Sequence, residues 1–342
     1  MSRIFGWDIG GAHLKLGVVD SGTIVAMRQI ACPLWLGLDR LADAMDEALA
    51  GLPPAEFHAV TMTGELADLF SSRDDGVAQI AQAVTARFGN EPTQFWGLDG
   101  FLSLDSALEH PESVASANFH ATASLVGTRL PTALLIDIGS TTTDIIRVID
   151  GHAAITARDD TSRMVSGELV YSGVVRTPVM AVVESVPFGG QIIPVMAEHF
   201  ATMADVHRLC GVLPGHADLH ASADGRGKSV DESRVRLARM IGRDAALADA
   251  KAWEECAAAI ASAQLAKLER AARQVLSAEP LGGDAPVIGA GVGRFLAIEL
   301  AARLRRPYRS IGEMVQASSG LADLVADAAP AAAVAWLLAS RA

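Results

Sequence analysis

A strand–turn–strand pattern that occurs twice constrains the fold of this 342-residue chain more than any other feature. In residues 134–146, LLIDIGSTTTDII, an apolar run ends in an acid, glycine and hydroxyl side chains follow, and a second acid opens another apolar run. Residues 4–19, IFGWDIGGAHLKLGVV, repeat the design. Each copy predicts two strands joined by a tight turn, in which glycine leaves the backbone N–H groups exposed.

These two turns are suited to binding a polyphosphate and its metal ion. Exposed N–H groups beside Ser, Thr or Lys form an anion-binding concavity, and an aspartate at a strand end can hold a hydrated Mg²⁺. The predicted magnesium ligands are Asp8 and Asp137. The predicted phosphate ligands come from both turns and are Gly10, Gly11, Lys15, Gly139, Ser140, Thr141 and Asp144. Two such turns that face each other would hold a diphosphate from both sides.

The composition limits the kind of partner. A formal charge of −12 disfavours general affinity for nucleic acid or anionic membranes, because both require a basic surface. The three cysteines stand far apart in the sequence, so neither a disulfide framework nor a zinc ribbon is expected. We see no signal peptide and no apolar stretch long enough to span a bilayer. We therefore expect a cytoplasmic protein with small-molecule partners; whether it forms a homodimer is left open.

The pattern of the remaining residues predicts an α/β chain in two halves. Strands are expected over 3–9, 14–19 and 23–30, and again over 133–138, 144–150 and 153–157. This is an internal duplication at the level of the motif. Helical spacing predicts helices over 36–52, 76–88, 111–125, 232–241, 252–276 and 322–339. We predict one domain over residues 1–130 and a second over 131–321.

A third glycine turn follows a late apolar strand, in residues 286–296, PVIGAGVGRFL. Its glycines, Gly289, Gly291 and Gly293, would let a flat or charged ligand approach the backbone at the start of a helix. A single Gly-x-Gly-x-Gly is weak evidence for a nucleotide site. The order of the three turns along the chain strengthens the prediction.

This order resembles that of the actin-like ATPase superfamily, which includes sugar kinases and the heat-shock chaperone ATPase. The resemblance implies two duplicated ribonuclease-H-like domains with a central cleft, and a C-terminal helix, 322–342, that returns to the N-terminal domain. The second turn, DIGSTTTD, is similar to that of the hydantoinase/oxoprolinase branch. This chain is much shorter than a full hydantoinase or oxoprolinase subunit, which disfavours ring-opening amidohydrolysis.

Five separated motifs narrow the resemblance. They are similar to motifs of the tetrahydromethanopterin-linked one-carbon-transfer proteins of methylotrophic bacteria and of the archaeal family that joins an aminomethylfuran unit to γ-glutamyltyramine in methanofuran biosynthesis. The motifs are WDIGGAHLK (7–15), MTGELAD (62–68), SANFHA (116–121), GELVY with RTP (167–171 and 176–178) and ADVHRL (204–209). The resemblance implies that substrate is bound by Asn118, His120, Tyr171 and Arg176.

Two carboxylates are candidates for a general base. Glu65 follows a predicted strand, where it either faces the cleft or stabilises a helix N-terminus. Glu168 lies in the polar stretch 166–178, which is either a substrate site or a surface loop. The predicted catalytic residues are Asp8, Lys15, Glu65, Asp137 and Glu168.

We therefore expect a transferase of methanofuran-type cofactor biosynthesis that uses Mg²⁺ and supports tetrahydromethanopterin-linked one-carbon metabolism. In the resembling family, a phenol oxygen displaces diphosphate from a furanylmethyl diphosphate and forms an ether. The phenolic acceptor is γ-glutamyltyramine or a tyrosine analogue. Two alternatives stay open: an ATP-dependent kinase or amidohydrolase of the same fold, and a non-catalytic scaffold that binds ATP.

Overall fold

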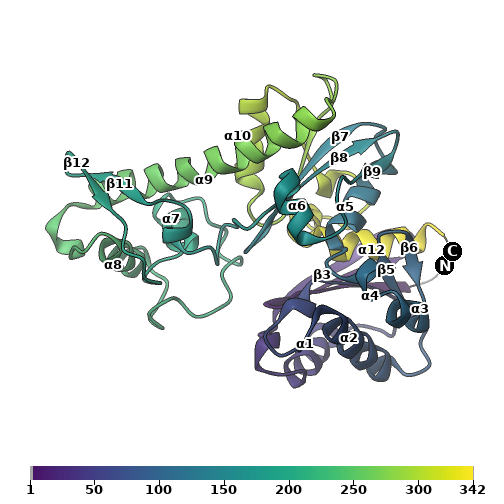
Figure 1. Ribbon diagram of the computed structural model, residues 1–342. Helices are drawn as coiled ribbons and strands as arrows, with labels where there is room; N and C mark the ends of the chain where they lie inside the picture. Colours follow the sequence, from purple (N-terminus) through teal and green to yellow (C-terminus); the bar gives the residue numbers. More distant parts are fainter. Residues whose placement is uncertain (1–2, 342) are drawn as a thin grey trace.

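Two mixed sheets with the same strand arrangement form the framework of the protein (Figure 1). The computed structural model describes residues 3–341. In spatial order, the first sheet consists of β3 (Thr23–Ala31), β2 (His13–Asp20), β1 (Arg3–Ile9), β4 (Phe57–Met62), β5 (Thr93–Gly97) and β6 (Gly100–Leu102). The second consists of β10 (Leu169–Val170), β8 (Thr143–Ile149), β7 (Ala133–Ile138), β13 (Val287–Ala290) and β14 (Tyr308–Ser310), with β9 (His152–Ala154) paired to β8.

Strands β1 and β7 hold equivalent positions in the two sheets. Each is antiparallel to the strand that follows it, β2 or β8, and parallel to a later strand on its other side, β4 or β13. A helix connects each parallel pair, as parallel strands require. This equivalence confirms the predicted α/β class with two duplicated ribonuclease-H-like halves.

The helices form three layers around the two sheets. Helices α1 (Asp39–Leu49) and α2 (Arg73–Phe88) cover the outer face of the first sheet, and α9 (Ala250–Ala278) and α10 (Arg294–Leu304) cover that of the second. Between the sheets lie α5 (Asn118–Gly127) and α12 (Ala329–Ala339). The remaining helices are α3 (Leu104–Glu109), α4 (Pro111–Val114), α6 (Asp160–Ser166), α7 (Met203–Leu209), α8 (Val230–Met240) and α11 (Ala322–Asp327).

The period-two alternation of the central strands decides where their acids point. In β1, Phe5 and Trp7 pack in the outer core with α1 and α2, whereas Ile4 belongs to the central core. In β7, Leu134 and Ile136 likewise pack outward and Leu135 packs inward. Asp8 and Asp137 share the parity of the inward residues, so both acids are directed between the two halves.

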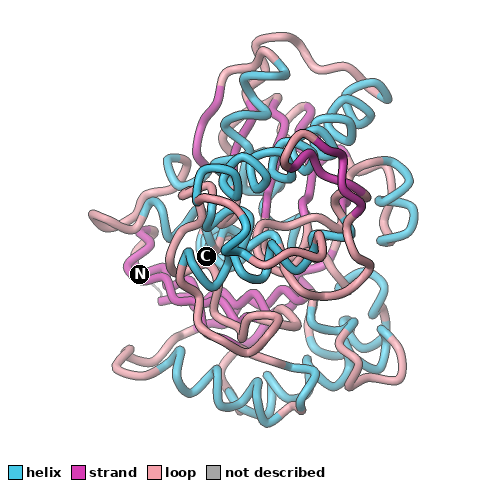
Figure 2. The backbone as a smooth tube through the Cα atoms, turned by 90° about the vertical axis from the view of Figure 1, so that its left-hand side faces the viewer, coloured by secondary structure: helices cyan, strands magenta, loops and turns pink. Residues whose placement is uncertain are grey.

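A separate extension projects from the second half (Figure 1). It contains the hairpin β11 (Ser185–Phe188) and β12 (Gln191–Pro194), helices α7 and α8, and the first half of α9. These elements have their own apolar core around Trp253 and Ile260. In the orthogonal view of Figure 2, the extension faces the viewer and lies in front of the two sheets.

Two predicted helices are each divided in the structure. The C-terminal helix, predicted as one element over 322–339, is divided into α11 and α12 at Ala328. Pro330 causes the break, because its ring excludes a helical bond to the carbonyl of Ala326; that carbonyl accepts instead from the Gly291 N–H at 2.7 Å. The helix predicted over 111–125 is divided into α4 and α5 near Ser116, whose φ is +52°.

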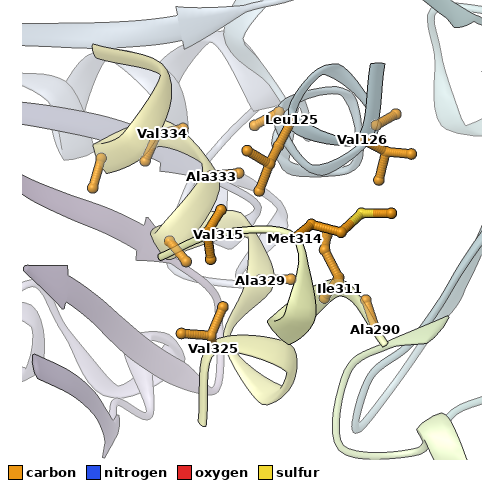
Figure 3. Packing of buried hydrophobic residues seen from close by; sticks show 14 of the residues in the cluster. Leu125, Val126, Ala290, Ile311, Met314, Val315, Val325, Ala329, Ala333 and Val334 are labelled. Atoms are coloured by element: carbon orange, nitrogen blue, oxygen red, sulfur yellow. The ribbon is translucent and has the colours of Figure 1, made fainter. Parts of the chain in front are cut away.

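Helix α12 packs closely against the first sheet although it ends the chain. Figure 3 shows Ala333 and Val334 of this helix beside Leu125 and Val126 of α5 in the central core. The helix can approach the sheet because Gly6 has no side chain; a Cβ there would overlap the backbone of Ala331. We propose on this basis the domain division made from the sequence, 1–130 with the C-terminal helices and 131–321.

Gly6→Ala is expected to lower the free energy of unfolding by about 1–3 kcal/mol, because the added methyl group must displace α12 from β1. Urea unfolding monitored by circular dichroism measures the effect. Gly283→Ala is the matched control, since a Cβ there meets no atom of residues 3–341 within 4 Å, and a change below about 0.5 kcal/mol is expected. Equal effects of the two substitutions would contradict the close packing.

Candidate active site

A cavity of about 530 Å³ lies where the two halves meet, and both glycine turns line it. This confirms the predicted central cleft. The wall is formed by Asp8, Gly10, Gly11, Ala12, His13, Lys15, Trp35, Thr63, Leu66, Ala67, Asp68, Ser116, Asn118, Asp137, Gly139, Ser140, Thr141, Thr142, Asp144, Asp160, Arg163, Leu169, Tyr171, Arg176 and Pro330.

The two turns have the same backbone geometry. In the first, the Gly10 N–H donates to the carbonyl of His13 at 2.9 Å; in the second, the Gly139 N–H donates to that of Thr142, also at 2.9 Å. The N–H groups inside each turn have no hydrogen-bond acceptor within residues 3–341, and they belong to Gly11, Ala12, Ser140 and Thr141. Unused N–H groups that line a cavity from both sides can bind an anion.

The two turns differ in the charge that faces each aspartate across the sheet. Asp8 stands opposite Lys15, whose ammonium lies 3.2 Å from its carboxylate. At the equivalent position of the second sheet, Asp137 stands opposite another acid, Asp144. Like charges directly opposite each other destabilise a sheet. The second turn therefore carries an unbalanced negative charge.

Arg163 of α6 balances only one of these two acids. Its guanidinium donates to the Asp144 carboxylate at 2.7 Å and lies 3.4 Å from the centre of the Phe119 ring. In the described part of the chain, Asp137 has no such partner. Burial, Asp144, Asp8 and Asp327 together raise the pKa of Asp137 to about 7, although Lys15 opposes them.

The residues around Asp137 fit a hydrated magnesium ion. Within residues 3–341, the buried Oδ1 atom of Asp8 has no hydrogen-bond partner, and no Lys, Arg or His lies within 4.0 Å of the Asp137 carboxylate, although Asp8 and Asp144 each have one. Within residues 3–341, no three His, Cys, Asp or Glu side chains converge as a preformed metal site. Magnesium commonly retains several waters and uses one or two carboxylates, which is what Asp8 and Asp137 offer.

The ionisation of Asp137 makes stability depend on pH. The folded carboxyl group has a pKa of about 7, whereas the unfolded group has a pKa near 3.8. Between these values the folded state binds more protons, so the free energy of unfolding contributed by Asp137 falls as pH rises from about 4 to 7 and is constant above.

Urea unfolding at pH 5 and pH 8 should therefore show a larger decline in the free energy of unfolding for the wild type than for Asp137→Asn. Magnesium should restore stability at pH 8 in the wild type alone. An identical decline in both proteins would contradict the assignment.

Three of the four predicted substrate residues line the cavity: Asn118, Tyr171 and Arg176. His120 does not. Its ring stacks on Trp96 with a centroid distance of 5.7 Å, and burial lowers its pKa to about 4. Asn118 and His120 stand two residues apart on one helix, and only the first faces the cavity.

Neither carboxylate predicted as the base belongs to the cavity wall. Glu168 is buried and its Oε1 accepts the N–H of Thr156 at 2.8 Å, so the geometry offers no support for its predicted role. Glu65 lies directly behind the wall, where its Oε1 accepts from the hydroxyl of Ser116 at 2.7 Å. Burial raises the pKa of Glu65 and so favours its protonated form.

The third glycine turn lies behind the cavity and outside its wall. A Cβ at Gly289 would overlap the ring of Tyr308, and one at Gly291 would overlap the carbonyl of Ile138 and the carboxylate of Asp137. Gly293 packs in the same way against Ile138 and Val174. These glycines allow β13 and α10 to support the strand end that carries Asp137. The prediction that they bind a nucleotide gains no support from this placement.

Several residues that line the cavity were not predicted from the sequence as residues of the site. Ser116 and His13 lie inside quoted motifs, and Arg163, Asp160 and Trp35 lie outside them. The unusual φ of Ser116 is visible only in the structure, and such outliers concentrate at functional sites. Asp160 pairs with Arg73 of α2 and thereby joins the two halves at this end of the cavity.

The duplicated sheets and the paired turns in one cleft define a fold of the actin-like ATPase type. This chain belongs to the hydantoinase/oxoprolinase family, whose pattern it matches over residues 56–331. It is similar to the (4-{4-[2-(gamma-L-glutamylamino)ethyl]phenoxymethyl}furan-2-yl)methanamine synthase of Methanocaldococcus jannaschii, with 31% identity over 243 residues that cover 70% of this chain and 72% of the relative. A synthase of the same name from Methanococcus vannielii is 32% identical over 111 residues, which cover 32% of this chain and 50% of that relative.

Among solved structures, a nucleotide-free acetone carboxylase shares the fold. The two proteins are 12% identical, with a TM-score of 0.55 over 89% of this chain and 68% of the carboxylase. Both sequence relatives are synthases, which supports an enzyme. No helix within residues 3–341 is long and apolar enough to cross a membrane.

Proposed function

We propose that this protein is a transferase that condenses an aminomethylfuran-methyl diphosphate with the phenol of γ-glutamyltyramine or a tyrosine analogue. The observation that carries the proposal is the pair of turns whose free N–H groups face one cavity, beside an aspartate, Asp137, that forms no ion pair within residues 3–341. The names of the two relatives support the choice of reaction, because their product contains the ether between a furanylmethyl group and a phenol. The reaction would serve methanofuran-type cofactor synthesis and tetrahydromethanopterin-linked one-carbon metabolism.

The chemistry needs diphosphate to leave as the ether forms. The phenol oxygen attacks the exocyclic methylene carbon, the carbon–oxygen bond to diphosphate breaks, and the diphosphate departs with the electron pair. The turn N–H groups and Lys15 would hold the phosphate oxygens where this charge develops. Asp8 and Asp137 would hold the hydrated Mg²⁺, which neutralises the leaving group when bound.

The phenol proton needs an acceptor near the wall. Ser116 lines the cavity and donates its hydroxyl hydrogen to Glu65 at 2.7 Å. A phenol hydrogen-bonded to Ser116 would pass its proton to the serine oxygen while the serine proton moves to Glu65. Burial raises the pKa of Glu65, so its carboxylate, when ionised, accepts a proton more readily than a carboxylate in water.

Release of diphosphate with Mg²⁺ tests the proposal. The purified protein is mixed with the furanylmethyl diphosphate, with and without γ-glutamyltyramine or tyrosine, and the ether is detected by mass spectrometry. Acceptor-dependent release with formation of ether is expected. Consumption of ATP in a parallel reaction, without ether, would instead indicate the ATP-dependent kinase or amidohydrolase. Binding of ATP without turnover of any substrate would indicate a scaffold.

A further inference from the structure

A group of aromatic and basic side chains lies beside the acidic cluster and plays no part in the chemistry above. Arg176, which follows β10, places its guanidinium carbon 5.3 Å from the centre of the Trp35 ring. The His13 and His220 rings are 4.7 Å apart, and His220 lies 5.7 Å from Trp35. Trp35, His13 and Arg176 all line the cavity. Remote parts of the sequence therefore form one corner of the site.

Arg176 differs from the other cations of the cavity wall in its pairing. Lys15 pairs with Asp8 and Arg163 pairs with Asp144. Within residues 3–341, no carboxylate lies within 4.0 Å of the Arg176 guanidinium. Its backbone is nevertheless fixed, because the Arg176 N–H donates to the Ser140 carbonyl at 2.8 Å. A positioned guanidinium without a counterion is a site for an anion.

His13 adds an unused polar atom to this corner. His13 is 7% exposed, and its Nε2 has no hydrogen-bond partner among residues 3–341. Burial, together with His220, Lys15 and Arg176, lowers its pKa to about 3, so the ring is neutral at physiological pH. A neutral imidazole contributes a hydrogen bond and no charge. The corner therefore offers one net positive charge, from Arg176, and one extra hydrogen-bonding atom.

We propose that Arg176 and His13, with Trp35 beside them, form a subsite for the carboxylate of the phenolic acceptor. A single charge suits a monoanion, whereas diphosphate finds free N–H groups and Lys15 at the turns. The planar guanidinium matches a carboxylate with two hydrogen bonds. The inference rests on the proposed function, since the product of the named relatives carries a γ-glutamyl group and hence an amino-acid carboxylate.

His220 closes this corner from the opposite half of the chain. Its Nε2 lies 2.9 Å from the carbonyl of Ala12 in the first turn. The loop that carries it is fixed by Asp218, whose carboxylate is 2.6 Å from Arg208 and 3.1 Å from Lys228. The subsite is thus held in place by ion pairs outside the cavity.

Calorimetric titration with three phenols tests the subsite without any turnover. γ-Glutamyltyramine and tyrosine carry a carboxylate, and tyramine does not. The wild type is expected to bind the two phenols that carry a carboxylate at least tenfold more tightly than tyramine. Arg176→Met is expected to abolish this difference in affinity and to keep the melting temperature of the wild type. The matched control is Arg129→Met, because Arg129 also lies over an aromatic ring, 4.5 Å from Trp336, but outside the cavity.

Two results would overturn the subsite. One is equal binding of all three phenols by the wild type, and the other is a preference for carboxylates that persists in Arg176→Met. A loss of inorganic diphosphate binding in Arg176→Met, with acceptor binding unchanged, would assign the guanidinium to the leaving group instead. Failure of the proposed function would appear separately, as the absence of ether in the turnover experiment while the calorimetric preference is still present.

Discussion

Asp137→Asn is expected to lower turnover by roughly 10³-fold and, at the same time, to stabilise the fold. Asparagine keeps the size of the side chain and removes the charge that would hold hydrated magnesium. Burial of this charge, together with Asp144, Asp8 and Asp327, raises the pKa of Asp137 to about 7. Its removal should therefore increase the free energy of unfolding at pH 8 by about 2–4 kcal/mol in the absence of Mg²⁺.

Steady-state diphosphate release and urea unfolding measure these two effects. Asp43→Asn is the control, because Asp43 is an exposed acid on α1, 73% exposed and outside the cavity, and neither activity nor stability should change appreciably. Near-normal turnover of Asp137→Asn would contradict the metal-binding role. A loss of stability would contradict the electrostatic interpretation of the cluster.

Arg163→Met is expected to destabilise the protein by about 3–5 kcal/mol, the usual cost of removing one partner from a buried ion pair. The guanidinium is 2% exposed, bonds to Asp144 at 2.7 Å and stacks on Phe119. Methionine fills much of the same volume but leaves Asp144 charged, buried and opposite Asp137. Thermal and urea unfolding measure the loss.

A double substitution separates charge from packing. Arg163→Met with Asp144→Asn removes both charges, so most of the lost stability should return. The control is Arg273→Met, which breaks an exposed pair with Glu269 and should change the free energy of unfolding by less than about 1 kcal/mol. If the double variant is as unstable as Arg163→Met alone, packing against Phe119 and not charge accounts for the effect.

The duplication explains why the cluster needs an external cation. Both halves use the same turn, closed by the same hydrogen bond, and both place an aspartate at the end of a central strand. The residue opposite that aspartate is Lys15 in one half and Asp144 in the other. If Lys15 had a counterpart at position 144, the cavity would balance its own charge and would have less affinity for a divalent ion.

The sequence by itself determined the framework and the centre of the site. An apolar run that ends in an acid is a local property, so it predicted the strands around Asp8 and Asp137. The acid–glycine spacing predicted both turns for the same reason. The sequence did not predict the start of α12. A proline is accepted in the first turn of a helix, and Pro330 alone does not show that a new helix begins just before it.

Only the tertiary structure decided which other side chains reach the cavity. Glu65 and Glu168 look equivalent in the sequence, yet one lies behind Ser116 and the other bonds to Thr156 away from the wall. Trp35 and Arg176 are 141 positions apart and meet because both halves pack against α5 and α12. Such contacts depend on how whole elements pack together, and no short stretch of sequence records that packing.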